Sequence, residues 1–298
     1  MILPESLTIY RPILVAIAYR MTGQVMISED IVQEAIVRWM NRPPETIIDP
    51  KAYLAKSVTN GCLNYLAKVK HERDAYKGVW LPEPFFTNSH VIDAQIDVSY
   101  GLMVLLEKLT PLERAVFVLR ESFDFGYAEL AQLFAVTEAN CRQLYHRATE
   151  KVVAKNRRFV IDPHQQESLL AAFVTASQTG DTDLLIRLLK THVEVYTDGG
   201  GKVSAAINPL FGSAIVSRFL QSLARKQSGH FTTQPTLMNG QVGILYHQIA
   251  TQQLTSVLVM EVDITGISRL FFVRNPDKLA HLNQLIRSGC HKNEFGLS

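Results

Sequence analysis

Apolar positions recur at helical spacing in two short blocks between residues 127 and 147. The residues of these two stripes, which would pack against each other, are Leu130, Ala131, Phe134, Cys141 and Leu144. Ala135 and Val136 separate the blocks, so the pattern predicts two short helices joined by a tight turn. This arrangement is typical of a helix-turn-helix.

The second of these helices is predicted to follow Thr137, whose hydroxyl can cap a free backbone N–H of the first turn. Its outward face carries side chains suited to DNA bases and phosphates, namely Arg142, Gln143, His146 and Arg147. One position departs from the motif: Ala135 stands where glycine is usual, and a positive φ would strain a residue with a Cβ. An ordinary helical hairpin with a solvated basic face is the alternative interpretation.

Helical spacing also fills residues 1–75 and 99–159. In the latter, Thr110-Pro111-Leu112-Glu113 has the form of a capping box that starts a supporting helix. Residues 76–98 have no sustained helical period and hold two prolines, so we expect a linker there. Because Trp80, Leu81, Phe85 and Phe86 are unusually apolar for a free linker, we expect it to pack on the C-terminal domain.

The pattern becomes mixed in residues 160–298. Two helical stretches precede a short strand at 193–196, and an amphipathic helix is expected at about 210–226. Segments rich in β-branched and aromatic residues then predict strands at 235–238, 243–250, 256–263 and 266–273, with Asn239-Gly240 as a hairpin turn. Helices followed by antiparallel strands predict an α+β domain, which a last helix from Pro276 closes.

Composition and charge narrow the class of protein. The 298 residues are 47% hydrophobic and 19% charged, an ordinary globular mixture long enough for two or three domains. The formal net charge of +2 is small, so any contact with nucleic acid must come from local clusters. One such cluster follows the helix-turn-helix, at Lys151, Lys155, Arg157 and Arg158.

Cysteine usage and hydropathy exclude several further classes. The three cysteines lie far apart in the sequence, so they indicate neither a disulfide framework nor a zinc site, and we expect no metal and no cofactor. The N-terminus lacks the basic region of a signal peptide, and the apolar stretches are too short to span a bilayer. We therefore expect a cytoplasmic protein that does not contact a membrane.

Two more helix faces and one loop are candidates for binding. The helix faces are Asp30, Gln33 and Glu34, and the helically spaced set Lys56, Asn60, Asn64 and Lys68. Either set could be only the solvated side of a helix. The glycine-rich loop 198–202 is a binding loop or simply a tight turn, since Asp-Gly and Gly-Gly pairs supply positive φ angles.

Taken in order, these features resemble bacterial extracytoplasmic-function sigma factors, which direct RNA polymerase to promoters. Residues 18–21 (AYRM) and 28–35 (SEDIVQEA) are similar to the polymerase-binding helices, 50–66 to the promoter-melting helix, and 109–147 to the second sigma domain. The chain is also similar to the group with a fused SnoaL-like domain, through WLPEP at 80–84, DGGGK at 198–202 and NPDKL at 275–279. The resemblance predicts two all-α sigma domains followed by a cone-shaped α+β domain.

The resemblance implies a role for each candidate set. Core RNA polymerase would be bound by Asp30, Gln33 and Glu34. The −10 promoter element would be engaged by Lys56, Asn60, Asn64 and Lys68, and the −35 element by Arg142, Gln143, His146 and Arg147. The C-terminal domain would be held against the linker and the sigma domains, and would regulate promoter recognition in cis, through Trp80, Pro82, Glu83, Asp198, Gly200, Lys202, Asn275, Asp277 and Lys278.

Other functions stay open at this point. The C-terminal domain could be a small-ligand sensor or an enzyme, with acid/base candidates Tyr196, Asp198, His247, Glu261 and Asp263, although no paired spacing selects one of them. A repressor or activator that never contacts polymerase would need only the helix-turn-helix. Because two DNA-contacting modules suit a bipartite promoter, we expect a sigma factor without catalytic activity.

Overall fold

Short-range signals set the ends of the helices in the first half of the chain. Thr110 caps α5 (Pro111–Phe123): its hydroxyl accepts a hydrogen bond from the Glu113 N–H at 3.3 Å, and the Glu113 carboxylate accepts one from the Thr110 N–H at 3.0 Å. The predicted capping box is therefore confirmed. Gly23, at φ 69°, follows the end of α1 (Glu5–Thr22), and its N–H donates to the Tyr19 carbonyl.

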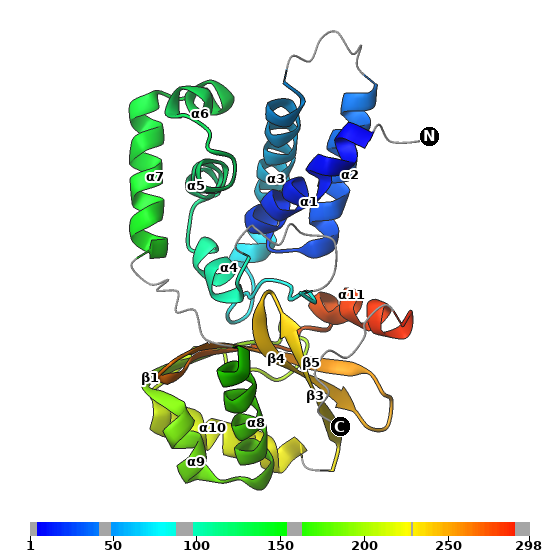
Figure 1. Ribbon diagram of the computed structural model, residues 1–298, viewed down its shortest axis with the longest axis vertical. Helices are drawn as coiled ribbons and strands as arrows, with labels where there is room; N and C mark the ends of the chain where they lie inside the picture. The colour runs from blue at the N-terminus through cyan, green and yellow to red at the C-terminus, as the bar shows by residue number, and fades with distance from the viewer. Residues whose placement is uncertain (1–4, 42–48, 88–97, 154–162, 228, 290–298) are drawn as a thin grey trace. The chain divides into compact units, whose positions relative to one another are not determined.

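The computed structural model describes residues 5–41, 49–87, 98–153, 163–227 and 229–289 (Figure 1). The helices that follow α1 in this half are α2 (Val25–Met40), α3 (Pro50–Asp74), α4 (Tyr100–Leu106), α5, α6 (Tyr127–Phe134) and α7 (Glu138–Val153). The chain forms two compact units, one of Met1–Asp74 with Asn88–Arg157 and one of Ala75–Thr87 with Arg158–Ser298. The predicted boundary at residue 159 and the basic residues Lys155, Arg157 and Arg158 lie outside the described residues.

The second half of α1 is the centre of the first unit. Residues 14–19 are all buried, because α1 packs against α2, α3 and α5 at the same time. A helix buried on every side has to be apolar all round, and the run LVAIAY meets that requirement.

The helix-turn-helix forms as the apolar spacing predicts. Leu130 of α6 and both Cys141 and Leu144 of α7 are buried, and the Thr137 hydroxyl accepts a hydrogen bond from the Asn140 N–H at 3.1 Å. Ala135 ends α6 in the left-handed region, at φ 53° and ψ 44°. The turn therefore holds an alanine in a conformation that disfavours a side chain with a Cβ.

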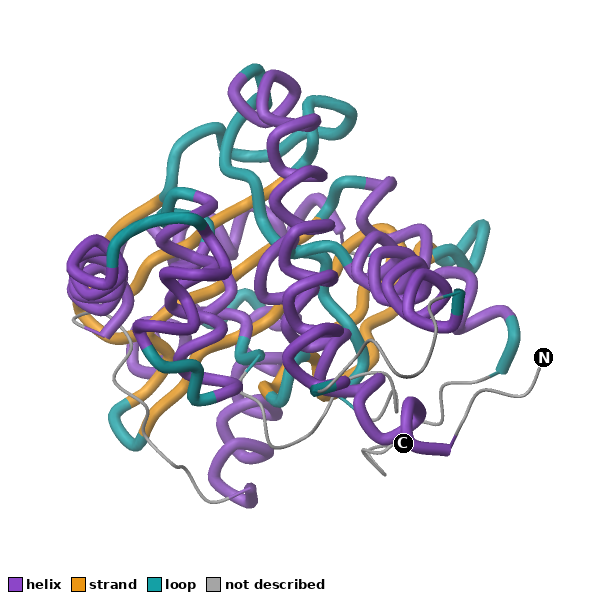
Figure 2. Tube along the Cα trace, turned by 90° about the horizontal axis from the view of Figure 1, so that it is seen from above, coloured by secondary structure: helices purple, strands orange, loops and turns teal. Residues whose placement is uncertain are grey.

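The second unit is built on one sheet with the strand order β2-β1-β6-β5-β4-β3, drawn in orange in Figure 2. The strands are β1 (Leu189–Asp198), β2 (Leu210–Phe211), β3 (Phe231–Met238), β4 (Gln241–Gln248), β5 (Leu254–Asp263) and β6 (Gly266–Val273). Strands β3 to β6 form the expected antiparallel run, and Asn239 and Gly240 turn between β3 and β4 at φ 53° and 73°.

One expectation for this sheet is wrong, and one pairing lies beyond what the pattern predicts. Strand β1 pairs with β6 in parallel, which is possible because a long crossover that includes α10 and strands β3 to β5 separates them in sequence. Residues 210 and 211 form β2 against β1 and do not begin the helix, since Gly212 at φ 86° interrupts the chain before α10 (Ser213–Gln227).

Helices α8 (Pro163–Thr179), α9 (Thr182–Leu188) and α10 cover one face of the sheet, and α11 (Pro276–Arg287) lies on the other side (Figure 1). The covered face is filled by an apolar core that includes Leu170 and Phe173 of α8, Val216 of α10, and Leu258 and Phe272 of the sheet. The C-terminal domain is therefore an α+β layer structure, as its pattern predicts.

We expect Ala135→Gly to raise the free energy of unfolding of the protein by about 1 kcal/mol, because glycine adopts the left-handed conformation without the Cβ clash. Ala128→Gly, an exposed alanine within α6, is the matched control and should lower the same quantity by about 1 kcal/mol. Denaturant titration of the three proteins measures both changes. Destabilisation by both substitutions would contradict strain at Ala135.

Candidate functional site

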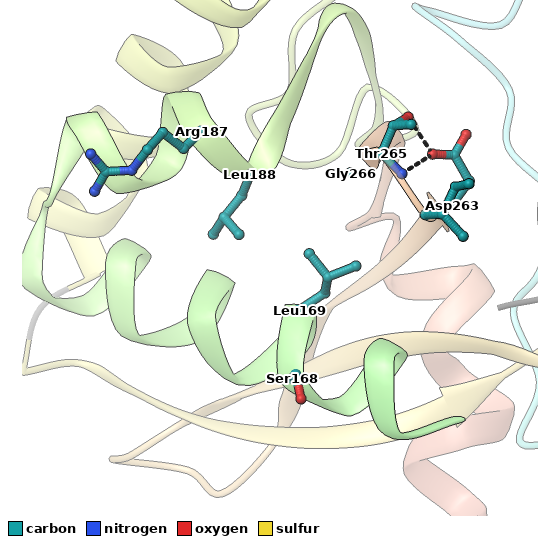
Figure 3. A pocket seen from close by; sticks show the side chains of 8 residues that line it. Ser168, Leu169, Arg187, Leu188, Asp263, Thr265 and Gly266 are labelled. Carbon is teal, nitrogen blue, oxygen red and sulfur yellow. Dashed lines mark hydrogen bonds between the residues drawn. The ribbon is translucent and has the colours of Figure 1, made fainter. Parts of the chain in front are cut away.

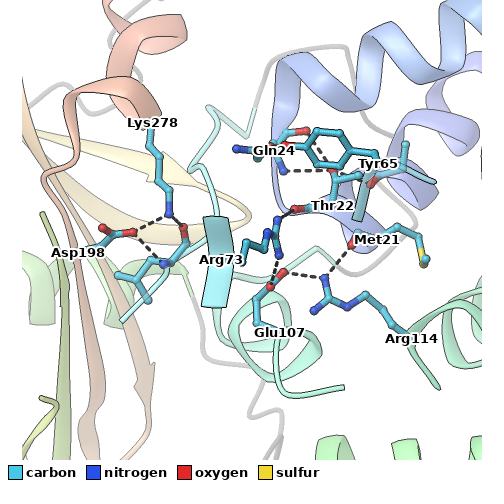
Figure 4. Close-up of polar contacts among 11 residues, drawn as sticks. Met21, Thr22, Gln24, Tyr65, Arg73, Glu107, Arg114, Asp198 and Lys278 are labelled. Carbon is cyan, nitrogen blue, oxygen red and sulfur yellow. Dashed lines mark hydrogen bonds and ion pairs between the residues drawn. The ribbon is translucent and has the colours of Figure 1, made fainter. Parts of the chain in front are cut away.

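Residues 75–87, called here the docked segment, pack on the C-terminal domain, and Asp198 at the end of β1 is their main anchor. Its Oδ1 accepts hydrogen bonds from the Tyr76 hydroxyl at 2.6 Å and the Gly200 N–H at 3.0 Å. Its Oδ2 accepts from the Leu81 N–H at 2.9 Å and from the Lys278 ammonium at 2.6 Å (Figure 4). Burial, together with the hydrogen bond to Asp198, raises the pKa of Tyr76, so this hydroxyl stays a donor.

Lys278 of α11 completes this anchor with a buried positive charge. Only 4% of its side chain is exposed, and none of the Asp198 side chain is. The ammonium also donates to the Leu81 carbonyl and lies 3.8 Å from the centre of the Trp80 ring. Because each charge is paired and surrounded by further partners, the desolvation of this ion pair can be offset.

Backbone geometry brings the three sequence motifs together at this point. The Asp198 carbonyl accepts from the N–H groups of Arg274 and Asn275, and Asn275 caps α11 through the Asp277 N–H. Gly200 lies at φ 61°, and a Cβ there would come within 2.3 Å of the Asn275 side chain. The glycine-rich loop is thus a tight turn that also seats Asn275, whose amide donates to the Tyr76 hydroxyl at 2.9 Å.

The exposed residues of these motifs contribute less to the stability of the contact. Lys202 and Asp277 form an ion pair at 2.6 Å, but their side chains are 54% and 64% exposed. Exposed pairs of this kind contribute less than about 1 kcal/mol. Pro82 and Glu83 are buried within the docked segment.

The far end of the docked segment extends the sheet at the edge of β3. Phe86 bridges Met238, and the Thr87 N–H donates to the Leu237 carbonyl at 3.1 Å. The Phe85 carbonyl accepts from the Asn239 N–H at 3.0 Å, and the Asn239 side chain accepts from the Phe85 N–H at 3.1 Å. These bonds satisfy backbone groups that an open sheet edge would leave unpaired.

The expected burial of the apolar linker residues is confirmed for Leu81, Phe85 and Phe86, whose exposed fractions are 0%, 5% and 5%. Trp80 is half-buried against Lys278.

Sequence reasoning missed three residues of this contact: Tyr76 of the docked segment, and Asn239 and His281, which bind the segment. The His281 Nε2 donates to the Pro84 carbonyl at 2.9 Å, and burial lowers the pKa of His281 to about 4. His281 lies one turn beyond Lys278, so its place on the same face of α11 was the available signal.

A second polar junction lies inside the first unit (Figure 4). The Glu107 carboxylate accepts from Arg73 of α3 and from Arg114 of α5, both at 2.7 Å. The same two guanidinium groups donate to the carbonyls of Thr22 and Met21 at the end of α1, at 2.6 and 2.7 Å. Glu107 therefore links α3 to α5, the helix that supports the helix-turn-helix. The two arginines that it binds also satisfy carbonyl groups at the end of α1.

The two other candidate helix faces are exposed. On α2, Asp30, Gln33 and Glu34 are open to solvent, and the apolar Met26 and Val37, 49% and 48% exposed, lie on the same stripe at helical spacing. On α3, the four candidates Lys56, Asn60, Asn64 and Lys68 are all exposed, while the opposite side is buried through Leu54, Val58, Cys62 and Leu66.

The predicted DNA-reading side chains of α7 are also exposed, at Arg142, Gln143, His146 and Arg147. Three of them lie near a carboxylate: Arg142 is 3.4 Å from Glu138, His146 is 3.5 Å from Glu150, and Arg147 is 3.5 Å from Glu113. Glu113 also binds Lys151 at 2.9 Å, and although burial alone would raise its pKa, the hydrogen bonds from Lys151 and Thr110 hold that pKa below its usual range.

The acid/base candidates of the C-terminal domain do not form one catalytic group. Tyr196 donates to Glu194, and Glu261 pairs with Arg269, whose Nε also lies 3.9 Å from Glu194. The other three candidates lie elsewhere: Asp198 binds the docked segment, His247 is at the end of β4, and Asp263 binds Lys190 and Thr265 at the turn between β5 and β6.

A pocket of about 470 Å³ lies between α8, α9 and this turn (Figure 3). Its lining includes Leu169, Leu188, Arg187 and Asp263. The carboxylate of Asp263 accepts two hydrogen bonds from Thr265, at 2.8 and 2.6 Å, so it already stabilises the turn.

In the part of the chain that the structure describes, no helix is long and apolar enough to cross a membrane, and no group of three or more potential ligands is placed to hold a metal.

Comparison with known proteins assigns the two helical modules. The family model of sigma-70 region 2 matches residues 7–72, and that of sigma-70 region 4 matches residues 101–152. The chain is 33% identical to the ECF RNA polymerase sigma factor SigJ of Mycobacterium tuberculosis in an alignment of 282 positions, and the match covers 89% of each protein. The chain belongs to the extracytoplasmic-function family of RNA polymerase sigma factors.

The solved structure of SigJ agrees with this assignment. The crystal structure of SigJ covers 91% of this sigma factor and 96% of its own chain, with a TM-score of 0.74 and 31% identity. A SnoaL-like protein from Burkholderia thailandensis covers 38% of the present chain and 97% of its own, with a TM-score of 0.31 and 15% identity. The predicted fold class, two all-α sigma domains followed by an α+β SnoaL-like domain, is confirmed.

We expect acid to destabilise the docked segment through His281. The folded-state pKa of about 4 lies below the unfolded value of about 6.5, so the unfolded chain binds more protons as the pH falls. The contribution of His281 to the free energy of unfolding should therefore be complete above about pH 6.5, and it should be lost progressively as the pH falls from about 6.5 to about 4.

Thermal melting at pH 7 and pH 5 tests this expectation. His281→Gln is the control, because its amide can still donate to the Pro84 carbonyl but does not titrate. Between pH 7 and pH 5, the melting temperature of the wild type should fall by more than that of His281→Gln. Equal losses would show that His281 does not carry the effect.

Proposed function

We propose that this sigma factor binds core RNA polymerase, engages a bipartite promoter through α3 and α7, and is regulated in cis by its C-terminal domain. The observation that carries the proposal is the docked segment. It lies between the two sigma regions in sequence, yet it is bound through Asp198 and Lys278 of the C-terminal domain.

Docking on polymerase is assigned to α2. Its exposed stripe alternates apolar Met26 and Val37 with Asp30 and Gln33, and Glu34 lies beside it. Apolar side chains that stay exposed beside charged and amide groups favour a protein interface over a merely solvated face. Core RNA polymerase is the partner that membership of the sigma family supports.

Promoter contact is assigned to α3 and α7. The polar face of α3 consists of Lys56, Asn60, Asn64 and Lys68, and such residues suit the exposed bases and phosphates of an opened −10 element. The outward face of α7, with Arg142, Gln143, His146 and Arg147, suits the major groove of a −35 element. The ion pairs of Arg142 and His146 are exposed on both sides and weak, so DNA can displace them.

The length of the tether between the two sigma regions supports the proposal of regulation in cis. Twenty-five residues separate the end of α3 at Asp74 from the start of α4 at Tyr100, and fully extended they would reach roughly 85 Å. With residues 75–87 docked, the twelve residues 88–99 remain, and their reach is roughly 40 Å. Docking thus limits how far the two DNA-binding modules can separate.

For direct recognition of the −35 element, we expect Arg142→Ala to weaken promoter binding by about 1–3 kcal/mol and to relax discrimination at one base pair. Promoter binding and transcription in vitro, with core polymerase and the full chain, measure both effects. A uniform loss on all sequences would make Arg142 a phosphate contact. If the wild-type chain bound DNA but neither bound core polymerase nor produced transcripts, a repressor would be the better description.

For regulation in cis, we expect Asp198→Asn to raise transcript yield by releasing the docked segment. Removing one member of a buried ion pair destabilises a contact by about 3–5 kcal/mol, since the other charge is left without its partner. Asp277→Asn is the matched control, because Asp277 belongs to the same motifs but is 64% exposed.

The two variants and the wild type are compared by transcription in vitro with core polymerase. Circular dichroism checks that each variant retains its helices. A lower yield from Asp198→Asn would mean that docking activates the protein, whereas equal yields from all three proteins would contradict regulation through the docked segment.

A further inference from the structure

Tyr127, the first residue of α6, lies against a basic residue of the recognition helix. The guanidinium carbon of Arg142 is 5.4 Å from the centre of the Tyr127 ring, and that of Arg120 is 4.6 Å from the same centre. An aromatic ring attracts a guanidinium group through the negative charge of its π-face. One ring therefore receives a cation from α5 and another from α7.

The ring is itself held in place by the core of the domain. It meets the Tyr145 ring edge-on at 6.2 Å, and Tyr145 stacks on Phe117 at 6.1 Å. The Tyr145 hydroxyl donates to Glu121 at 2.6 Å, and Arg120 donates to the Phe125 carbonyl at 2.7 Å. A row of contacts thus runs from the buried Phe117 of α5 to Arg142 on the surface of α7.

A cation–π contact attracts an arginine without using its hydrogen-bond donors. The N–H groups of a guanidinium point outward in its plane, and they bind a guanine edge in that plane. Arg142 is 57% exposed, and its carboxylate neighbour, Glu138 at 3.4 Å, is 48% exposed, so DNA can displace this pair. Arg147 differs, because its Nε faces the buried carboxylate of Glu113 at 3.5 Å.

We propose that Tyr127 is a positioning residue for base recognition: it orients Arg142 before DNA binds through a contact that uses none of the hydrogen-bond donors with which Arg142 would bind a base pair of the −35 element. The inference rests on the proposed function, since it assigns the orientation of a side chain that reads DNA there. Ordering a long flexible side chain in advance removes part of the conformational entropy that binding would otherwise cost.

The test uses the full chain with core polymerase and a promoter library in which the −35 segment is randomised. Sequencing of the bound promoters gives the base preference at each position for the wild type, Tyr127→Leu, Tyr127→Phe and Arg142→Ala. We expect Tyr127→Leu to lower the preference at the position read by Arg142 by about two- to five-fold, as an exposed cation–π contact implies. Tyr127→Phe keeps the aromatic face and should retain the preference.

The double variant Tyr127→Leu/Arg142→Ala separates positioning from folding. In the background without Arg142, replacing Tyr127 should change no base preference, because the side chain that it orients is absent. An equal effect in both backgrounds, or a uniform loss at all positions, would overturn the inference and make Tyr127 part of the domain core.

The same data distinguish this inference from the proposed function. If Arg142→Ala changes no base preference, then base reading by Arg142 fails, and the role of Tyr127 fails with it. If Arg142→Ala changes a preference and Tyr127→Leu does not, only the positioning role is overturned.

Discussion

The buried ion pair between Asp198 and Lys278 is the contact on which the architecture of the C-terminal half depends. Removing two charges from water costs several kcal/mol for each ion, and the attraction between them offsets this only when their other hydrogen-bonding capacity is also met. Here the carboxylate accepts from Tyr76 and Leu81 as well, and the ammonium lies over Trp80. All three of these partners, which make burial of the pair tolerable, belong to the docked segment.

This dependence also bears on how the docked segment would leave its site. If the docked segment leaves, Asp198 and Lys278 keep each other but lose the groups that complete their surroundings. Partly satisfied buried charges are unfavourable, so intermediate states of docking should be sparsely populated. The edge of β3 behaves in the same way, because residues 85–87 supply the partners of its outer backbone groups. Both ends of the docked segment are thus bound by polar groups that would lose hydrogen-bond partners without it.

Much of the fold could be predicted because its signals are short-range. The capping box at Thr110, the cap at Thr137 and the strained turn at Ala135 all involve residues within a few positions of one another. The burial of the apolar linker could also be predicted, since exposed tryptophan and phenylalanine side chains are unfavourable in water. What was missed, such as β2 and the parallel pairing of β1 with β6, requires knowledge of which distant segments meet.

The helices, most of the strands, the helix-turn-helix, the family and the motifs around Asp198 could all be read from the amino-acid sequence, because periodicity, capping and turn preferences act locally. What those motifs bind became visible only in the folded chain. Tyr76 and Asp198 are 122 residues apart, and His281 and Pro84 are 197 apart. No local pattern records such pairs, since the chain meets itself there only after the sheet and α11 have placed both partners.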